Sequence, residues 1–130
     1  MVKQVIVLRK DLNMRKGKMA AQAAHASMKV LLDSARPLER TSAGGTVELT
    51  LWPEAVEWLA GLFTKVVVGC DSEAELLALQ RTATDARLKT ALIQDSGLTE
   101  FGGVPTYTAL AIGPHEAGRF EGVTAHLKLL

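Results

Sequence analysis

Apolar residues along this chain fall into short runs that are separated by longer amphipathic stretches. Four runs are rich in Val, Ile, Leu or Thr and have the length of β-strands, and they cover residues 4–8, 65–70, 90–94 and 106–112. A weaker alternation over residues 46–51 predicts a short edge strand after a loop at 41–45.

The stretches between the runs predict three helices. Residues 15–34 contain almost no helix breaker, and Arg36-Pro37 is expected to end this long helix because a residue before proline disfavours the helical conformation. Pro53 suits the first turn of a short helix that continues to about residue 62. Ser72 is a suitable N-cap for a third helix that continues to about residue 86.

Helical spacing also predicts which side chains face the core. In the long helix, the small and apolar side is expected to pack, and it consists of Ala20, Ala24, Ser27, Met28 and Leu31. A second face of the same helix is polar, with Lys18, Gln22, His25 and Lys29 spaced by four, three and four positions. In the short helix we expect four inward side chains, namely Val56, Leu59, Ala60 and Phe63.

Strands that alternate with helices predict a three-layer α/β/α domain built around a small sheet. The 130 residues are enough for one domain with a real core, and no repeat or linker divides them, so we expect a single domain over 1–130. Because 48% of the residues are apolar and only 5% are aromatic, Val, Leu and Ala are expected to fill the core.

The composition argues against a membrane or secreted protein. No segment approaches the roughly 20 apolar residues of a membrane span, and the strand-like start lacks the basic and apolar blocks of a signal peptide. The single cysteine, Cys70, cannot form an internal disulfide. We therefore expect a cytoplasmic protein.

The net charge of +1 hides a strong asymmetry along the chain. Residues 1–29 contain seven basic residues and one acid, whereas the remainder contains eight basic residues and thirteen acids. This pattern fits an ordinary solvated face, and it equally fits a local docking site for a polyanion on an otherwise acidic protein.

The most informative segment is Lys16-Gly17-Lys18, at the start of the long helix. Two ammonium groups lie where the free amides of a helix N-terminus add to a positive field, and a glycine lets the chain turn there. Such a corner attracts phosphate, and it holds Lys18 where its ammonium could stabilise a developing negative charge.

Several familiar motifs are absent. The Gly17-Lys18 pair lacks the upstream glycine and the following Ser or Thr of a phosphate-binding P-loop. The three histidines have no metal-ligand spacing, so we expect neither a metal nor a cofactor. We interpret Cys70 as a small buried residue, and Ser96 lacks the sequence context of a nucleophile.

Asp95 remains open between two interpretations. It ends a strand that is expected to be parallel, where α/β folds collect reactive groups, but it also precedes Ser96-Gly97 and could simply shape a turn. Thr99, Thr106 and Thr108 gain meaning only if they meet Lys18 in space.

The chain as a whole resembles the peptidyl-tRNA hydrolase 2 family. The matching motifs are Asp11-Leu12-x-Met14-x-Lys16-Gly17-Lys18-x-Ala20-Ala21-Gln22-x-x-His25-Ala26, Trp58-Leu59, Val66-Val67-Val68 with Asp71-Ser72-Glu73, Asp95-Ser96-Gly97-x-Thr99, Thr106-Tyr107-Thr108, Ala111-Ile112-Gly113-Pro114 and the tail Val123-Thr124-x-His126-Leu127-Lys128-Leu129-Leu130. Together they cover the chain except for roughly residues 36–54.

The resemblance implies a mixed four-stranded sheet, a homodimer, and hydrolysis of the ester that joins a peptide to tRNA, without a metal. By matched position, the active site would contain Lys18, Gln22, Asp95, Thr99 and Thr108. Contacts to tRNA phosphates would come from Arg9, Lys10, Arg15, Lys16, His25 and Lys29.

Three departures from the family pattern keep other functions open. Leu98 replaces a usual arginine, the segment 100–105 is one residue longer, and the stretch 38–54 exceeds the usual length. The alternatives are an RNA-binding protein that has lost its chemistry, and a protein-interaction module that uses the 38–54 segment.

Overall fold

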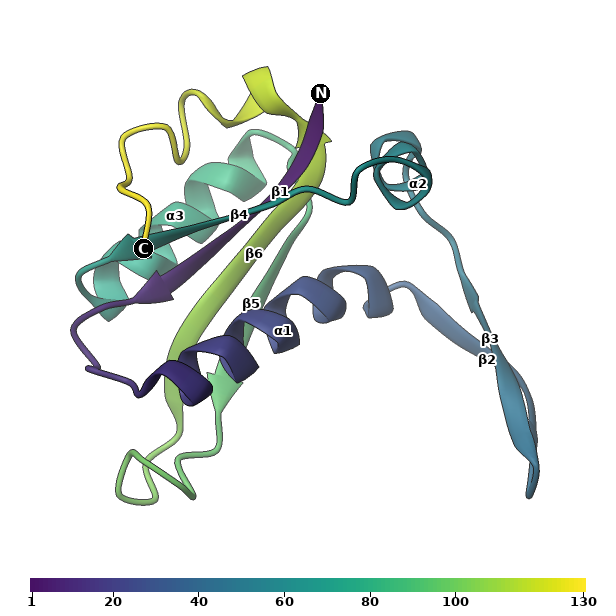
Figure 1. Ribbon diagram of the computed structural model, residues 1–130, viewed down its shortest axis with the longest axis horizontal. Helices are drawn as coiled ribbons and strands as arrows, with labels where there is room; N and C mark the ends of the chain where they lie inside the picture. The colour runs from purple at the N-terminus through teal and green to yellow at the C-terminus, as the bar shows by residue number, and fades with distance from the viewer.

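The computed structural model describes all residues from 1 to 130 (Figure 1). The elements follow one another as β1 (Val2–Arg9), α1 (Lys16–Leu32), β2 (Ala35–Thr41), β3 (Gly44–Leu49), α2 (Pro53–Ala60), β4 (Lys65–Cys70), α3 (Glu73–Asp85), β5 (Thr90–Asp95), β6 (Thr106–Glu116) and a short 3-10 helix (Ala117–Phe120). No helix combines the length and the apolar character that a membrane crossing requires.

Four strands form one mixed sheet in the order β4-β1-β6-β5. The β1 and β4 strands are parallel, and β6 is antiparallel to both β1 and β5. The strands β1, β4 and β5 therefore end at the same edge of the sheet, although the expectation of a parallel neighbour for β5 is wrong.

Helices cover both faces of this sheet, which confirms the α/β prediction. On one face, α3 packs Leu76, Leu79 and Ala83 against Val7 and Leu110 of the central strands. On the other face lies α1 (Figure 1), whose Ala26 and Val30 pack with alanines and larger aliphatic residues of the strands. The Cys70 thiol is part of the α3 layer, and its burial raises the pKa to about 11, so the thiol is un-ionised in the core.

The side of α1 that packs agrees only in part with the predicted one. Ser27 is buried and Leu31 packs against the core as expected, whereas Ala20, Ala24 and Met28 are exposed. The other buried side chains of the helix are Gln22, Ala26 and Val30. Ser27 donates to Gln4 Oε1 at 2.6 Å, and this buried hydrogen bond fixes α1 to β1. The helix also ends at Leu32, before the Arg36-Pro37 pair that was expected to stop it.

The region after α1 folds as a two-stranded hairpin, which we name the β2–β3 arm. The prediction placed only residues 46–51 in a strand, but β2 and β3 pair with each other and with no strand of the main sheet. Figure 1 shows the arm projecting from the end of α1 that lies farthest from the 96–105 loop.

The predicted inward face of α2 is also wrong. Pro53 begins the helix as expected, but Ala55 and Trp58 are the buried residues. Val56, Leu59 and Phe63 are about half exposed, and Ala60 is exposed as well. The spacing of apolar residues did not identify the core face because both faces of α2 are apolar.

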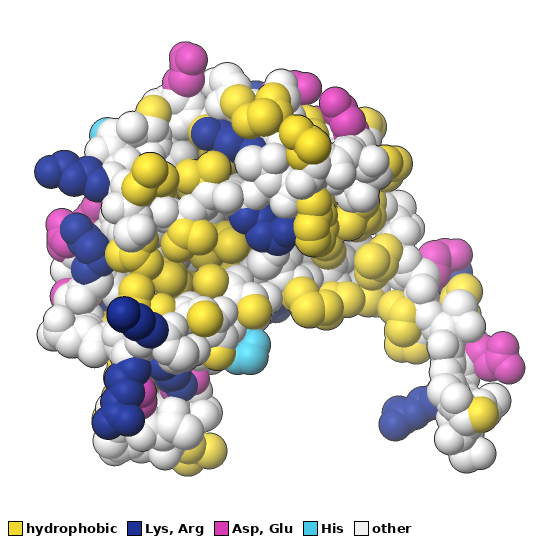
Figure 2. All heavy atoms as spheres, viewed as in Figure 1, with side chains coloured by type: hydrophobic (Ala, Val, Ile, Leu, Met, Phe, Trp, Pro, Cys, Tyr) yellow, Lys and Arg dark blue, Asp and Glu magenta, His cyan; other side chains and the backbone are white.

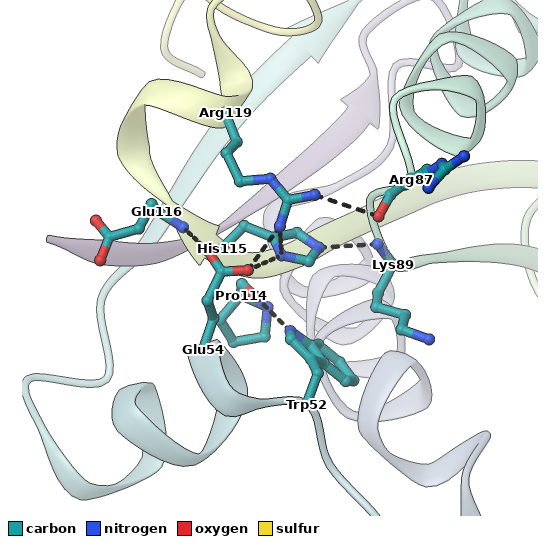
Figure 3. A network of polar contacts seen from close by, with 8 residues as sticks. All are labelled: Trp52, Glu54, Arg87, Lys89, Pro114, His115, Glu116 and Arg119. Carbon is teal, nitrogen blue, oxygen red and sulfur yellow. Dashed lines mark hydrogen bonds and ion pairs between the residues drawn. The ribbon is translucent and has the colours of Figure 1, made fainter.

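A polar network fastens the start of α2 to the end of β6 (Figure 3). The buried His115 ring lies with Nδ1 2.6 Å from Glu54 Oε1, and its Nε2 accepts a hydrogen bond from the Lys89 backbone N–H at 2.9 Å. Arg119 donates to the same Glu54 oxygen at 2.7 Å, and Trp52 donates to the Pro114 carbonyl at 2.7 Å. These partners assign the proton to Nδ1 and leave no room for one on Nε2.

This network predicts a loss of stability at mildly acidic pH. Burial lowers the pKa of His115, so the unfolded chain takes up the proton first when the pH falls below about 6.5. We expect the melting temperature of the protein to be flat above that pH and to fall between pH 6.5 and 5. The comparison is with His115→Asn, whose amide can still donate to Glu54 and which should lack this slope; an equal slope in both proteins would contradict the assignment.

Candidate functional site

The long-range contact that defines the candidate site joins α1 to the loop after β5. Lys18 Nζ donates to Asp95 Oδ1 at 2.9 Å and to Thr99 Oγ1 at 2.9 Å. The Lys18 and Asp95 side chains are 14% and 13% exposed, so the pair is partly shielded but open to water. An ammonium has three N–H donors, and this arrangement leaves the third for a ligand.

Behind this pair lies a buried chain of hydrogen bonds. Gln22, one turn after Lys18, donates through Nε2 to Asp95 Oδ1 at 3.2 Å. Its Oε1 accepts a 2.5 Å hydrogen bond from the Thr108 hydroxyl. Both ends of the Gln22 amide are therefore occupied, and Gln22 and Thr108 are almost completely buried.

A β-bulge brings Thr108 into this chain. The register between β5 and β6 pairs Ile93 with Ala109 and Gln94 with Tyr107, so Thr108 is the extra residue. Tyr107 packs in the α3 layer, whereas Thr108 turns toward α1. Regular alternation would have reversed these two side chains.

The Asp95 carboxylate is stabilised in its charged form. The hydrogen bond from Lys18 is the main cause of a lowered pKa, and the Gly97 backbone N–H adds a hydrogen bond of 2.8 Å to Oδ2. Gly97 has φ +81°, and a Cβ at this position would lie 2.1 Å from the Val104 carbonyl oxygen. The turn thus requires glycine, and the Asp95 carboxylate that contacts Lys18 also shapes this turn.

Three of the six side chains that were predicted to contact phosphate form ion pairs with carboxylates of this chain. Arg9 donates to both carboxylate oxygens of Asp11 and to the Tyr107 carbonyl, and the hydrogen bond to Asp11 raises the pKa of this already strong base. Lys10 lies 3.2 Å from Asp71. Lys29 lies 2.7 Å from Asp33, one turn further along α1.

The other three side chains of this predicted set are freer to contact a phosphate. Arg15 is largely exposed and approaches Glu100 only at 3.9 Å, while Lys16 and His25 have no ion pair. Arg15 is also the N-cap of α1, where no side chain caps the free amides, and the first turn contains no acid. This end of α1 therefore combines exposed N–H groups with uncompensated positive charge, as an anion site does.

Phe101 is a neighbour of Lys18 that the sequence analysis did not single out. Its ring centre lies 5.6 Å from Lys18 Nζ, within the range of a cation–π contact. Leu98 is 83% exposed and contributes no polar group to the site. An aromatic residue in a Gly-rich loop gave no periodic signal that could have identified it.

Comparison with known proteins identifies the family of this chain. Residues 2–130 match the family described as "Peptidyl-tRNA hydrolase PTH2". A protein named peptidyl-tRNA hydrolase from Thermococcus onnurineus is 40% identical over 134 residues, which cover 98% of this chain and 97% of the relative. Proteins of the same name from Methanocaldococcus jannaschii and Methanopyrus kandleri are 39% and 40% identical, and these alignments cover at least 99% of each chain. The chain therefore belongs to the PTH2 family of peptidyl-tRNA hydrolases.

Proposed function

We propose that this protein hydrolyses the ester between the peptide and the 3′ ribose of peptidyl-tRNA at the centre formed by Lys18 and Asp95. Water adds to the ester carbonyl and the ribose oxygen leaves, which gives a peptide carboxylate and a tRNA with a free hydroxyl. The observation that carries this proposal is the convergence of Lys18, Asp95 and Thr99 from two distant segments on one accessible spot.

Lys18 acts on the oxygen that becomes negatively charged. Two of its N–H groups are held by Asp95 and Thr99, so the third is directed without further reorganisation toward a bound substrate. A donor that is already oriented before the reaction stabilises the tetrahedral oxyanion more than water does. The free amides at the start of α1 add to the same field.

Asp95 serves mainly to hold Lys18 and to orient water. Its lowered pKa makes the carboxylate a weak base, which disfavours full proton abstraction. Oδ1 accepts from Lys18 and Gln22, whereas Oδ2 accepts only the Gly97 N–H and keeps one lone pair for a water molecule. Gln22 and Thr108 act through Asp95, because neither is exposed to substrate.

The tRNA is bound through its phosphates by the exposed cations near the start of α1. Arg15, Lys16 and His25 are the best placed, and Arg9, Lys10 and Lys29 would first have to leave their carboxylate partners. An A-form acceptor stem is recognised by shape and backbone and not by base edges.

The protein would act in the cytoplasm during translation, as a homodimer that is supported by the apolar surface around α2 and the β2–β3 arm.

Removal of either charge should abolish most turnover. We expect Lys18→Ala to lower kcat by ~10²–10³, the usual effect of removing one oriented electrostatic donor, and Asp95→Ala to have an effect of similar size because it releases that donor. The measurement is release of a labelled peptide from peptidyl-tRNA, with circular dichroism to verify the fold. Lys128→Ala, a lysine in the C-terminal tail, is the matched control and should retain activity.

The same assay separates the alternative functions. An RNA-binding protein without chemistry would bind peptidyl-tRNA and release no peptide, and an interaction module would do neither. Full activity of both Lys18→Ala and Asp95→Ala would contradict the proposed centre.

Gln22 and Thr108 should affect the rate through the pKa and position of Asp95, without contacting substrate. Thr108→Val frees the Gln22 amide, and Gln22→Met removes one of the hydrogen bonds that lower the pKa of Asp95. We expect kcat to fall about tenfold with KM unchanged. The acid limb of the pH–rate profile should also move to higher pH, because the Asp95 pKa rises; a profile that stays in place would show that Gln22 has a packing role only.

Binding should depend strongly on salt. If about four phosphates are neutralised, the logarithm of affinity for tRNA should fall with log salt at a slope of roughly −3. Lys16→Ala and Arg15→Ala should each reduce that slope by about one. The measurement is fluorescence anisotropy of labelled tRNA across a salt titration, and a flat response in the wild type would contradict this surface.

A further inference from the structure

The 96–105 loop holds an aromatic ring beside the candidate centre. The Phe101 ring centre lies 5.6 Å from Lys18 Nζ. The ring is half-buried, yet Phe101 belongs to neither hydrophobic core and is not among the side chains packed against the two cores. The ring therefore contributes little to the core of the protein, and it forms part of the wall around the Lys18 ammonium.

The position of this ring is fixed by hydrogen bonds within the loop. The Gly103 N–H donates to the Gly97 carbonyl at 2.8 Å, and the Val104 N–H donates to the Phe101 carbonyl at 3.0 Å. The Thr106 hydroxyl donates to the Val104 carbonyl at 2.8 Å. These bonds order the loop before a ligand arrives, which lowers the entropic cost of binding on the ring.

The loop lies along the first turn of α1. Its Glu100 approaches Arg15 at 3.9 Å, while the next residue, Phe101, approaches Lys18, which is three positions after Arg15. Figure 2 shows Lys and Arg side chains gathered over the start of α1 and the adjoining loop. Phe101 therefore lies beside both the Lys18 ammonium and the cationic end of α1.

The covalent structure of the substrate indicates which group reaches this ring. The ribose that carries the peptide ester also carries a base, and the first phosphate is attached to the same ribose. With the ester at Lys18 and the phosphates at Arg15 and Lys16, one ribose spans the space between them, and its base lies next to the start of α1. Phe101 is the aromatic side chain in contact with Lys18 there.

The peptide is the other group close to the ester, and it suits this ring less well. The peptide extends from the ester carbonyl away from the ribose, and hence away from the phosphates. Its side chains also vary from substrate to substrate, whereas the base at the 3′ end of tRNA is always adenine. A base stacks on an aromatic ring with its flat face, and this contact is typical of the recognition of unpaired RNA.

We propose that Phe101 stacks on the terminal adenine of the tRNA and so holds the ester-bearing ribose beside Lys18. The ring takes no part in breaking the ester bond, and it supplies binding energy from a part of the substrate that does not react. The location of the ester rests on the proposed function. The stacking itself needs no hydrolysis and is tested with tRNA that carries no peptide.

Fluorescence anisotropy with two labelled, deacylated tRNAs tests the stacking. One tRNA is intact, and in the other the terminal nucleotide keeps its ribose and phosphate but lacks its base, so the charges are equal. We expect the wild type to bind the intact tRNA about tenfold more tightly, the usual effect of one base stacked on an aromatic side chain.

Three variants show whether the aromatic ring causes this preference. Phe101→Leu, which keeps an apolar side chain without a π-face, should bind both tRNAs equally, and Phe101→Trp should retain the preference. Leu98→Ala, at an exposed apolar residue of the same loop, is the matched control and should behave as the wild type.

Turnover separates the base from the peptide as the partner of the ring. With peptidyl-tRNA, Phe101→Leu should raise KM about tenfold and leave kcat nearly unchanged, because the base contact is made equally before and during the reaction. The rise in KM should be the same for peptides that end in Gly and for peptides that end in Leu.

A wild type that binds both tRNAs equally, a preference that survives in Phe101→Leu, or a KM rise confined to peptides that end in Leu would overturn the proposal. A base-dependent affinity in a wild type without turnover would support the stacking and contradict only the proposed hydrolysis.

Discussion

The close approach of α1 to the sheet sets the geometry of the candidate site. Four of the eight buried residues between α1 and the sheet are alanines, namely Ala26, Ala91, Ala109 and Ala111, so the helix can approach β5 and β6 closely. Farther along α1, the Ser27–Gln4 hydrogen bond prevents the helix from sliding along its axis. Under these two constraints a lysine of α1 meets a carboxylate 77 residues later in the chain.

Charge and burial divide the site into two parts with different tasks. Lys18 and Thr99 face solvent and are the groups that a substrate can contact, whereas Gln22 and Thr108 lie beneath them and hold Asp95. Because every polar atom of this buried chain has a partner, the arrangement is rigid before substrate binds. Preorganised charge of this kind suits the proposed ester hydrolysis.

Two surfaces extend from opposite ends of α1. The N-terminal end presents uncapped amides and exposed cations, which suit phosphate, and the C-terminal half presents Met28 and its apolar hollows, which suit protein. The stretch that departs most from the family pattern forms the β2–β3 arm beside the second surface.

The sequence by itself determined the α/β class, the four strands of the sheet, the Pro53 and Ser72 helix starts, and Lys18 and Asp95 as candidates, because strand runs, caps and motifs are local signals. Only the tertiary structure decided which faces of α1 and α2 are buried, since alanine-rich and uniformly apolar helices have no clear periodicity. It also decided that the bulge at Thr108 turns this residue toward Gln22 and that residues 35–49 form an arm, because register and strand pairing depend on partners distant in the chain.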